Sequence, residues 1–233
     1  MEYLKWNEKK ISDFSHDSLA AFYSSGFVFT RIDRGVMHQT RSARIDLKQF
    51  ELSSENRRIM KKTDGLELTS RTLPIPEAEY DWNIAKLGKD FYETKFGPGI
   101  FSAQKIKEIL TSADSSNFNK LLVYSFNKKI IGYAICFEAA GKESGFMHYS
   151  YPFYDLTVTD ANGAPMKDLG LGMMLRAIID SQSRGLRYIY IGSLQRPADS
   201  YKLQFSGLEW FDKTTWNKDA EQAKAILTET HER

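Results

Sequence analysis

Apolar and polar residues alternate regularly in the second half of the chain, and the period of the alternation changes along it. Residues 121–126, 130–139 and 146–156 repeat with period two, which predicts three antiparallel strands joined by short connections. Residues 168–183 instead follow a strongly apolar helical pattern that ends at Gly185, and a strand pattern follows at 187–192. This order predicts an α+β protein with a mixed, mostly antiparallel sheet flanked by helices.

The first half of the chain alternates between short strand and helix patterns. Asp17 precedes a short helical pattern that stops at Gly26, and two strand patterns, 27–32 and 37–47, are separated by an Arg34-Gly35 turn. Further patterns predict a helix from Ser53 or Ser54 to Gly65, a strand from 66 ended by Pro74 and Pro76, a helix over 81–95 whose apolar face includes Trp82, and a helix capped by Ser102.

Composition indicates a protein with a substantial core. The 233 residues are 42% hydrophobic and 13% aromatic, no apolar run approaches the length of a membrane span, and the sequence begins without an apolar leader. A soluble, cytoplasmic and monomeric protein is therefore expected. The single cysteine, Cys136, lies in an apolar run and is expected to be a buried strand residue. His38 and His148 have no ligands at metal spacing, so no metal site is expected.

The net charge of +2 does not by itself indicate a nucleic-acid binder, but the charge is unevenly placed. Residues 31–62 contain nine basic and four acidic side chains. In the predicted helix of this region, basic residues recur at i, i+1, i+4 and i+5 and suit phosphate groups, although they also suit the end of a helix. These residues, the candidate phosphate-binding group, are Arg57, Arg58, Lys61 and Lys62.

A series of motifs runs along the chain: HYSYPFYDL, DLGLGMMLRAI, YIYIG, YKLQF and Trp216, with SSENRRIMKK upstream. In scattered pieces over about residues 37–216, these motifs and their order resemble the arginyl- and leucyl-tRNA–protein transferases. The resemblance implies a GNAT-like acyltransferase fold, and it makes the four cations of SSENRRIMKK the candidate tRNA-binding group. It also implies an amino-terminal extension over 1–36, a GNAT-like aminoacyltransferase domain over 37–216, and a carboxy-terminal helix or tail over 217–233.

The activity that the resemblance implies is transfer of an amino acid, of the Arg or Leu type, from aminoacyl-tRNA to a protein's amino terminus, with an acidic first residue on the acceptor. Such a site must hold an unprotonated amine, stabilise an oxyanion and return a proton to the leaving hydroxyl. Asp155, beside Tyr154, is the candidate base or amine-orienting group, and a simple loop cap is the alternative for it. Lys202 is the third candidate catalytic residue.

The candidate substrate-binding residues are less specific as signals. Gly170 and Gly172 either form a turn before the helix or hold a phosphate or oxyanion at its amino end. Glu209 and Glu138 either assist the acid–base chemistry of the site or are surface charges. The substrate-binding set is Tyr201, Gln204, Glu209, Gly170 and Gly172.

Two departures from the family pattern keep other functions open. The family's cysteine-rich amino-terminal module is absent, so no metal or redox role is carried over and no cofactor is expected. Lys167-x-x-Gly170-x-Gly172 approaches the Arg/Gln-x-x-Gly-x-Gly pyrophosphate loop of acetyl-CoA-dependent GNAT enzymes. An acyl-CoA-dependent N-acetyltransferase, with acetyl-CoA as donor, is therefore the alternative. A non-catalytic tRNA- or degron-binding module is the third hypothesis.

Overall fold

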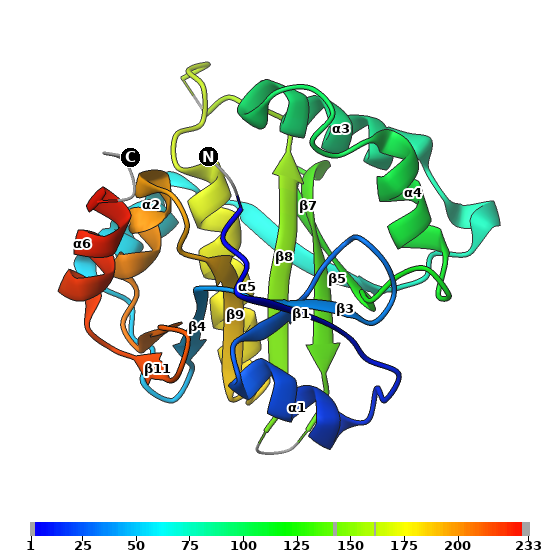
Figure 1. Ribbon diagram of the computed structural model, residues 1–233. Coiled ribbons are helices and arrows are strands. Elements are labelled where there is room, and N and C mark those ends of the chain that lie inside the picture. Colours follow the sequence, from blue (N-terminus) through cyan, green and yellow to red (C-terminus); the bar gives the residue numbers. More distant parts are fainter. Residues whose placement is uncertain (1–2, 142–143, 161, 230–233) are drawn as a thin grey trace. The chain divides into compact units, whose positions relative to one another are not determined.

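A computed structural model describes residues 3–141, 144–160 and 162–229. The chain divides into two compact units. The first unit holds residues 1–54, 138–148 and 180–233, and the second holds 55–137 and 149–179. Each unit combines strands and helices (Figure 1). The connection predicted at GKESG, 141–145, lies partly outside the described residues.

A three-stranded antiparallel sheet opens the first unit. It has the order β1 (Asn7–Lys10), β3 (Val36–Gln39), β2 (Phe27–Phe29). Helix α1 (His16–Ser24) precedes β2, and Ser15 rather than the predicted Asp17 caps it, through a bond from the Ser18 N–H. Gly26 and Gly35 both have φ near +79°, a backbone conformation that glycine adopts readily, which explains why the helix and the β2–β3 turn end there. Strand β1 was not predicted.

The strand predicted over 37–47 is wrong in one respect, because it is two strands. Strand β3 ends at Gln39, and β4 (Ser42–Asp46) belongs to a different sheet. Between them the Ser42 N–H bonds back to the Thr40 carbonyl at 2.6 Å, which turns the chain. The Thr40 hydroxyl donates to Leu4 O and the Arg41 guanidinium to Leu194 O, so polar partners outside the ladder stabilise the break.

The rest of the first unit is built on β4. The hydrogen-bonded order is β11-β10-β4-β9-β8. Strands β9 (Tyr188–Ser193) and β10 (Leu208–Phe211) flank β4 antiparallel, and β11 (Trp216–Asn217) pairs with β10. Strand β8 (Phe146–Tyr154) runs parallel to β9 over three residue pairs, from Phe146↔Tyr188 to His148↔Tyr190. The 3₁₀ helix η2 (Pro197–Gln204) and helix α6 (Ala220–Glu229) complete the unit.

The second unit contains the predicted antiparallel strands. Its order is β8-β7-β6-β5, with β5 (Leu66–Thr72), β6 (Lys120–Phe126) and β7 (Lys129–Ala139). Strands β7 and β8 lie side by side in Figure 1. The helices are α2 (Ser54–Lys62), α3 (Trp82–Phe96), α4 (Ala103–Thr111) and α5 (Leu169–Ser183), with a 3₁₀ turn, η1 (Glu77–Glu79). The elements β7, β8, α2 and α5 have residues in both units.

The core of the second unit follows the predicted apolar pattern with one exception. Ser102 caps α4, and Ile106, Ile109 and Leu110 are buried as predicted. Cys136, in the middle of β7, is also fully buried, as expected. Trp82 is 63% exposed, so its prediction as a core residue is wrong. It is the first residue of α3, and Ile84 and Ala85 provide the buried positions of that turn.

No helix within the described ranges has the combined length and apolar character that crossing a membrane requires.

Candidate active site

Tyr154 and Asp155 lie at the end of β8, where the predicted chemistry was expected. The Tyr154 ring packs against Phe91 with centroids 4.8 Å apart. Its hydroxyl lies against the first turn of α5, because a Cβ added at Gly170 would be only 3.1 Å from the hydroxyl oxygen. Gly170 therefore lets the tyrosine approach the helix closely. The phenol is held at the amino end of α5.

Asp155 is fixed by its own loop. Its backbone N–H donates to Ile131 O at 2.8 Å, and its Oδ1 accepts hydrogen bonds from the Thr157 N–H at 2.8 Å and the Thr157 hydroxyl at 2.6 Å. Burial acts to raise the pKa of Asp155, but these two bonds and the nearby Lys129 ammonium outweigh it and hold the pKa below its usual value. The group is thus an anion at neutral pH. It is better suited to orienting an ammonium or amine than to accepting a proton.

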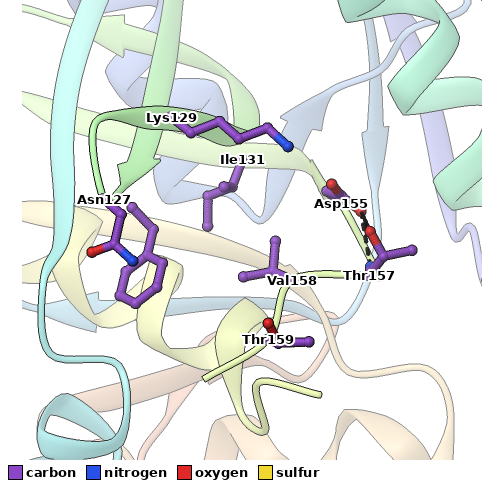
Figure 2. Close-up of a pocket in the computed structure, with 8 residues that line it drawn as sticks. Asn127, Lys129, Ile131, Asp155, Thr157, Val158 and Thr159 are labelled. Carbon is purple, nitrogen blue, oxygen red and sulfur yellow. Dashed lines mark hydrogen bonds between the residues drawn. The ribbon is translucent and has the colours of Figure 1, made fainter. Parts of the chain in front are cut away.

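A pocket of about 320 Å³ opens beside Asp155. Figure 2 shows the Lys129 side chain extending toward Asp155, with Ile131 and Val158 to one side of the two charged groups. The lining residues are Phe126, Asn127, Lys129, Ile131, Asp155, Thr157, Val158 and Thr159. Lys129 was not predicted as a site residue. The sequence feature that could have indicated Lys129 is the two-residue loop Asn127-Lys128, which places Lys129 at the turn end of the β6–β7 hairpin.

Gly170 and Gly172 lie inside α5 and not in a turn before it. Both fall in its first turn, and the Gly172 N–H donates to Asp168 O at 2.8 Å, the first bond of the helix. The N–H groups before that bond are the ones that a helix leaves without intrahelical acceptors. A Cβ at Gly172 would lie 2.6 Å from the Thr63 hydroxyl oxygen, so this glycine allows α2 and α5 to approach closely.

The basic residues of α2 are exposed, and half of them are ion-paired. Lys62 Nζ lies 2.7 Å from Asp168 Oδ2, and Arg58 pairs with Glu55 and lies 3.8 Å from the same Asp168 oxygen. Within the described ranges Arg57 and Lys61 form no ion pair. Two of the four predicted phosphate-binding cations are thus free for a ligand, and the other two are held at the amino end of α5 by Asp168.

Arg176 fixes the carboxyl end of α2 onto α5, a role that the sequence did not reveal. Its guanidinium donates to Thr63 O, Leu66 O, the Thr63 hydroxyl at 3.0 Å and Gly172 O at 3.3 Å. The Thr63 hydroxyl in turn donates to Ile59 O at 2.9 Å. The bonds thus join the segment that follows α2, residues 63–66, to the first two turns of α5. The cations of α2 therefore have a defined position relative to the first turn of α5.

A second pocket, of about 310 Å³, lies between the end of α2 and the loop that precedes α5. Lys62 and Lys167 contribute its positive charges, and Asp160 and residues 164–166 form the loop side. The Asp160 carboxylate accepts bonds from the N–H groups of Asn162 and Ala164, so it shapes this loop.

The remaining predicted residues belong to the first unit, and internal contacts occupy several of them. Lys202 is buried, and its ammonium donates to Ser193 O at 2.7 Å and to Asp199 Oδ1 at 3.1 Å. Burial lowers the pKa of Lys202, and Asp199 opposes that shift. Gln204 Nε2 donates to Tyr201 O at 2.6 Å, and Tyr201 is 41% exposed. The catalytic and binding roles of these three residues stay predictions.

Glu209 is buried in an ion pair with Arg44. The Arg44 Nε lies 2.8 Å from Glu209 Oε2, and the guanidinium stacks between the rings of Tyr188 and Trp216, 3.9 Å from each centroid. Glu209 is therefore not a surface charge, and its place in substrate binding is still a prediction. Glu138 pairs with Arg184 at 2.7 Å.

The predicted residues thus form two groups, each described in its own unit. One group is in the second unit, where Tyr154, Gly170, Gly172 and the α2 cations meet at the first turn of α5, and Asp155 follows Tyr154 in the sequence. The other group, in the first unit, is Tyr201, Lys202, Gln204 and Glu209.

The order of elements defines the fold class. Three antiparallel strands, β6, β7 and β8, lead into helix α5, and β9 then returns parallel to β8. With α3 and α4 between β5 and β6, this is the α+β, GNAT-like fold, with a mixed, mostly antiparallel sheet and flanking helices.

Comparison with solved structures returns matches at low identity. The structure of L-PGS from Bacillus licheniformis is 11% identical, with a TM-score of 0.48, over 93% of this chain and 70% of that one. The C-terminal domain of a protein described as a lysylphosphatidylglycerol synthetase from Agrobacterium fabrum is 12% identical, with a TM-score of 0.45, over 82% and 63%. A GCN5-related glucosamine N-acetyltransferase region of a fungal β-N-acetylglucosaminidase is 13% identical, with a TM-score of 0.46, over 90% and 23%.

No protein-family model matches the chain, and no curated protein matches it.

Proposed function

We propose that the protein is an acyltransferase that moves an aminoacyl group from aminoacyl-tRNA to an amine at a protein's amino terminus. The observation that carries the proposal is the junction of α2 and α5. Exposed cations on α2 are fixed by Arg176 to the helix whose first turn holds the Tyr154 hydroxyl. A ligand with several phosphates and a reactive ester at its end suits this arrangement.

In this proposal the acceptor amine is held by the free carboxylate oxygen of Asp155. The amine nitrogen attacks the ester carbonyl carbon, a C–N bond forms, and the C–O bond to the tRNA ribose breaks. The proton that the amine loses goes to the leaving ribose hydroxyl, and the Tyr154 hydroxyl is the candidate to pass it on. Because the ester is already activated, positioning and oxyanion stabilisation provide most of the catalysis.

The phosphates of the donor are assigned to Arg57 and Lys61, which have no ion pair in the described ranges, and to Lys62 after it leaves Asp168. Backbone N–H groups at the start of α5 add a partial positive charge. These contacts are independent of tRNA sequence, so donor choice must depend on the aminoacyl group.

The direct test is intact-mass analysis of a peptide with a free amino terminus, incubated with the protein, acetyl-CoA and a pool of charged tRNAs. An added amino-acid residue mass is the expected result. Arg57→Gln/Lys61→Gln should weaken tRNA binding, while the control Lys95→Gln/Lys224→Gln removes two exposed lysines elsewhere and should not. Asp155→Asn should lower acyl transfer without weakening tRNA binding.

An acyl-CoA-dependent N-acetyltransferase is the second candidate, and the Lys167-x-x-Gly170-x-Gly172 sequence at the start of α5 favours it. Lys167 lines the 310 Å³ pocket with Lys62, where a pyrophosphate would meet two cations. An added acetyl mass in the same experiment would select this candidate. tRNA binding without transfer from any donor would instead support a non-catalytic module.

A further inference from the structure

The pocket beside Asp155 is lined by one anionic and one cationic group that can still bind a ligand. Both hydrogen bonds from Thr157 go to Asp155 Oδ1, and Oδ2 has no hydrogen-bond partner in the described part of the chain. The Lys129 ammonium likewise forms no ion pair there, with Asp155 or with any other carboxylate. Figure 2 shows the two groups facing the same space, with the ammonium directed toward Asp155. Opposite charges are therefore held near each other without being joined.

The position of Lys129 is set by a turn that the chain adopts at a cost. Asn127 and Lys128 have φ of 50° and 63°, the left-handed conformation that a two-residue hairpin loop requires. Glycine is the usual residue at the second position, and lysine there is disfavoured by about 1 kcal/mol. Such a turn keeps Phe126 paired with Lys129, so the lysine is held at the mouth of the pocket by the ladder.

Two apolar side chains line the pocket beside the two charges. They are Ile131 from β7 and Val158 from the loop after β8 (Figure 2), and Asn127, Thr157 and Thr159 are the polar residues of the lining. A volume of about 320 Å³ is at the small end of the range for small-molecule sites. The space suits a ligand with two charged ends close together and a short aliphatic group.

We propose that this pocket binds the zwitterionic head group of an α-amino acid, with its ammonium on Asp155 Oδ2, its carboxylate on Lys129 and its side chain against Ile131 and Val158. A phosphate or other simple anion would be repelled by Asp155, and a simple amine would be repelled by Lys129. This inference goes beyond the proposed function, and the two meet at one atom: the ammonium of a bound free amino acid would take the same Asp155 oxygen that the proposed function assigns to the acceptor amine, so the two would compete. Binding itself requires no donor.

The test is a titration of the full chain with three probes, monitored by the chemical shifts of the amide signals in NMR spectra. Each of two analogues lacks one of the two charges of L-valine. L-valine carries both charges, L-valinamide lacks the carboxylate and N-acetyl-L-valine lacks the ammonium. L-valine is expected to bind about tenfold or more tightly than either analogue, since each analogue lacks one charge-assisted contact. Equal binding of the three probes, or binding of none, would overturn the proposal.

Variants assign each end of the ligand. In Lys129→Gln the preference for L-valine over L-valinamide is expected to disappear while the preference over N-acetyl-L-valine stays. In Asp155→Asn the reverse is expected. Lys128→Asn is the matched control, because it removes the neighbouring lysine and asparagine tolerates the left-handed conformation; it should leave both preferences intact. The same loss in Lys128→Asn would overturn the assignment.

A peptide amide beginning with aspartate offers an amine and a carboxylate from a protein source. Tighter binding of Asp-Ala amide than of L-valine would overturn the choice of a free amino acid. L-valine binding as described, with no acyl transfer to any acceptor, would remove the proposed function and leave the pocket assignment standing. Acyl transfer to a peptide, with no preference among the three valine probes, would support the proposed function and overturn the pocket assignment.

Discussion

At the scale of single residues, some charged side chains in this protein are bound by internal partners and others are open to a ligand. Lys202 and Lys129 are the clearest contrast. The Lys202 ammonium is buried and donates to Ser193 O and Asp199, whereas the Lys129 ammonium is exposed and forms no ion pair in the described ranges. A sequence motif identifies a lysine but not its partners, which explains why Lys202 was singled out and Lys129 was not.

Lys202→Met should lower the free energy of unfolding by about 2–4 kcal/mol, because it leaves Asp199 and the Ser193 carbonyl without a buried cationic partner. Urea unfolding of the variant measures the loss, and a double variant with Asp199→Asn should lose less than the sum of the two single variants. If Lys202→Met unfolds at the wild-type urea concentration and loses only acyl transfer, the lysine acts on the substrate and not on the fold.

At the scale of elements, the amino end of α5 is held against α2 by a small number of specific contacts. Asp168, with φ of 62°, places its carboxylate beside Lys62 and near Arg58. The Asp168 carboxylate thus binds Lys62 and lies near Arg58, two cations that a bound phosphate would also contact. A polyanionic ligand must therefore displace an internal anion before it can use all the cations of α2.

Asp168→Asn should bind uncharged tRNA about two- to tenfold more tightly at low salt, because Lys62 and Arg58 are released and one negative charge is removed. Asparagine tolerates the left-handed backbone at this position. Filter binding over a range of salt concentrations measures the effect, which should shrink as salt rises. Asp90→Asn, which breaks the exposed Lys86 pair on α3, is the control and should not change tRNA binding. Unchanged binding in Asp168→Asn would show that this carboxylate does not compete with the ligand.

The elements themselves were largely predictable, and the contacts between them were not. Period-two and helical patterns gave β6, β7, β8, α3, α4 and α5 with small errors at the ends, because each pattern follows from a buried face. Strand β1 was missed because all four of its residues are exposed and leave no apolar alternation. Arg176 was missed because its function depends on carbonyls of Thr63 and Leu66, which the helical pattern of α5 does not reveal.

The candidate site was predictable only where a motif coincided with an element end. Asp155 and Tyr154 were identified because they end an aromatic strand, and both lie at a pocket or helix terminus. Gly170 and Gly172 were predicted either to form a turn or to hold a phosphate or oxyanion; both lie inside α5, where their small size allows close packing against Tyr154 and Thr63. Whether a glycine is needed for its backbone conformation or for its missing side chain depends on neighbours that are distant in sequence.

At the scale of the whole molecule, buried titratable groups make stability depend on pH. His148 is 2% exposed, its Nδ1 lies 3.0 Å from the Tyr23 hydroxyl, and burial lowers its pKa from 6.5 to about 3. The folded state therefore favours the neutral ring, and the unfolded state binds a proton more readily. Its contribution to stability is complete above pH 6.5 and is lost as the pH falls from 6.5 toward 3.

The free energy of unfolding should thus fall by several kcal/mol between pH 6.5 and about pH 3. His38 contributes with the same sign, since burial lowers its pKa, while Glu8 acts to raise it. Asp46 and Asp155, whose pKa values are also low, add their part only below about pH 4. Urea unfolding at several pH values measures the slope, and His148→Gln should flatten it between pH 6.5 and 4. Parallel slopes for the variant and the wild type would contradict this account.

The buried thiol of Cys136 has a practical consequence for following motion in the second unit. It is the single sulfhydryl in the 233-residue sequence, and it lies in the middle of β7, between strands β6 and β8. A thiol reagent can reach it only when that strand opens. The rate of labelling under native conditions therefore reports the opening free energy of the sheet that carries Lys129 and that ends, in β8, next to Asp155. Comparing this rate with and without a ligand would detect binding as kinetic protection, with no need to engineer a probe into the chain.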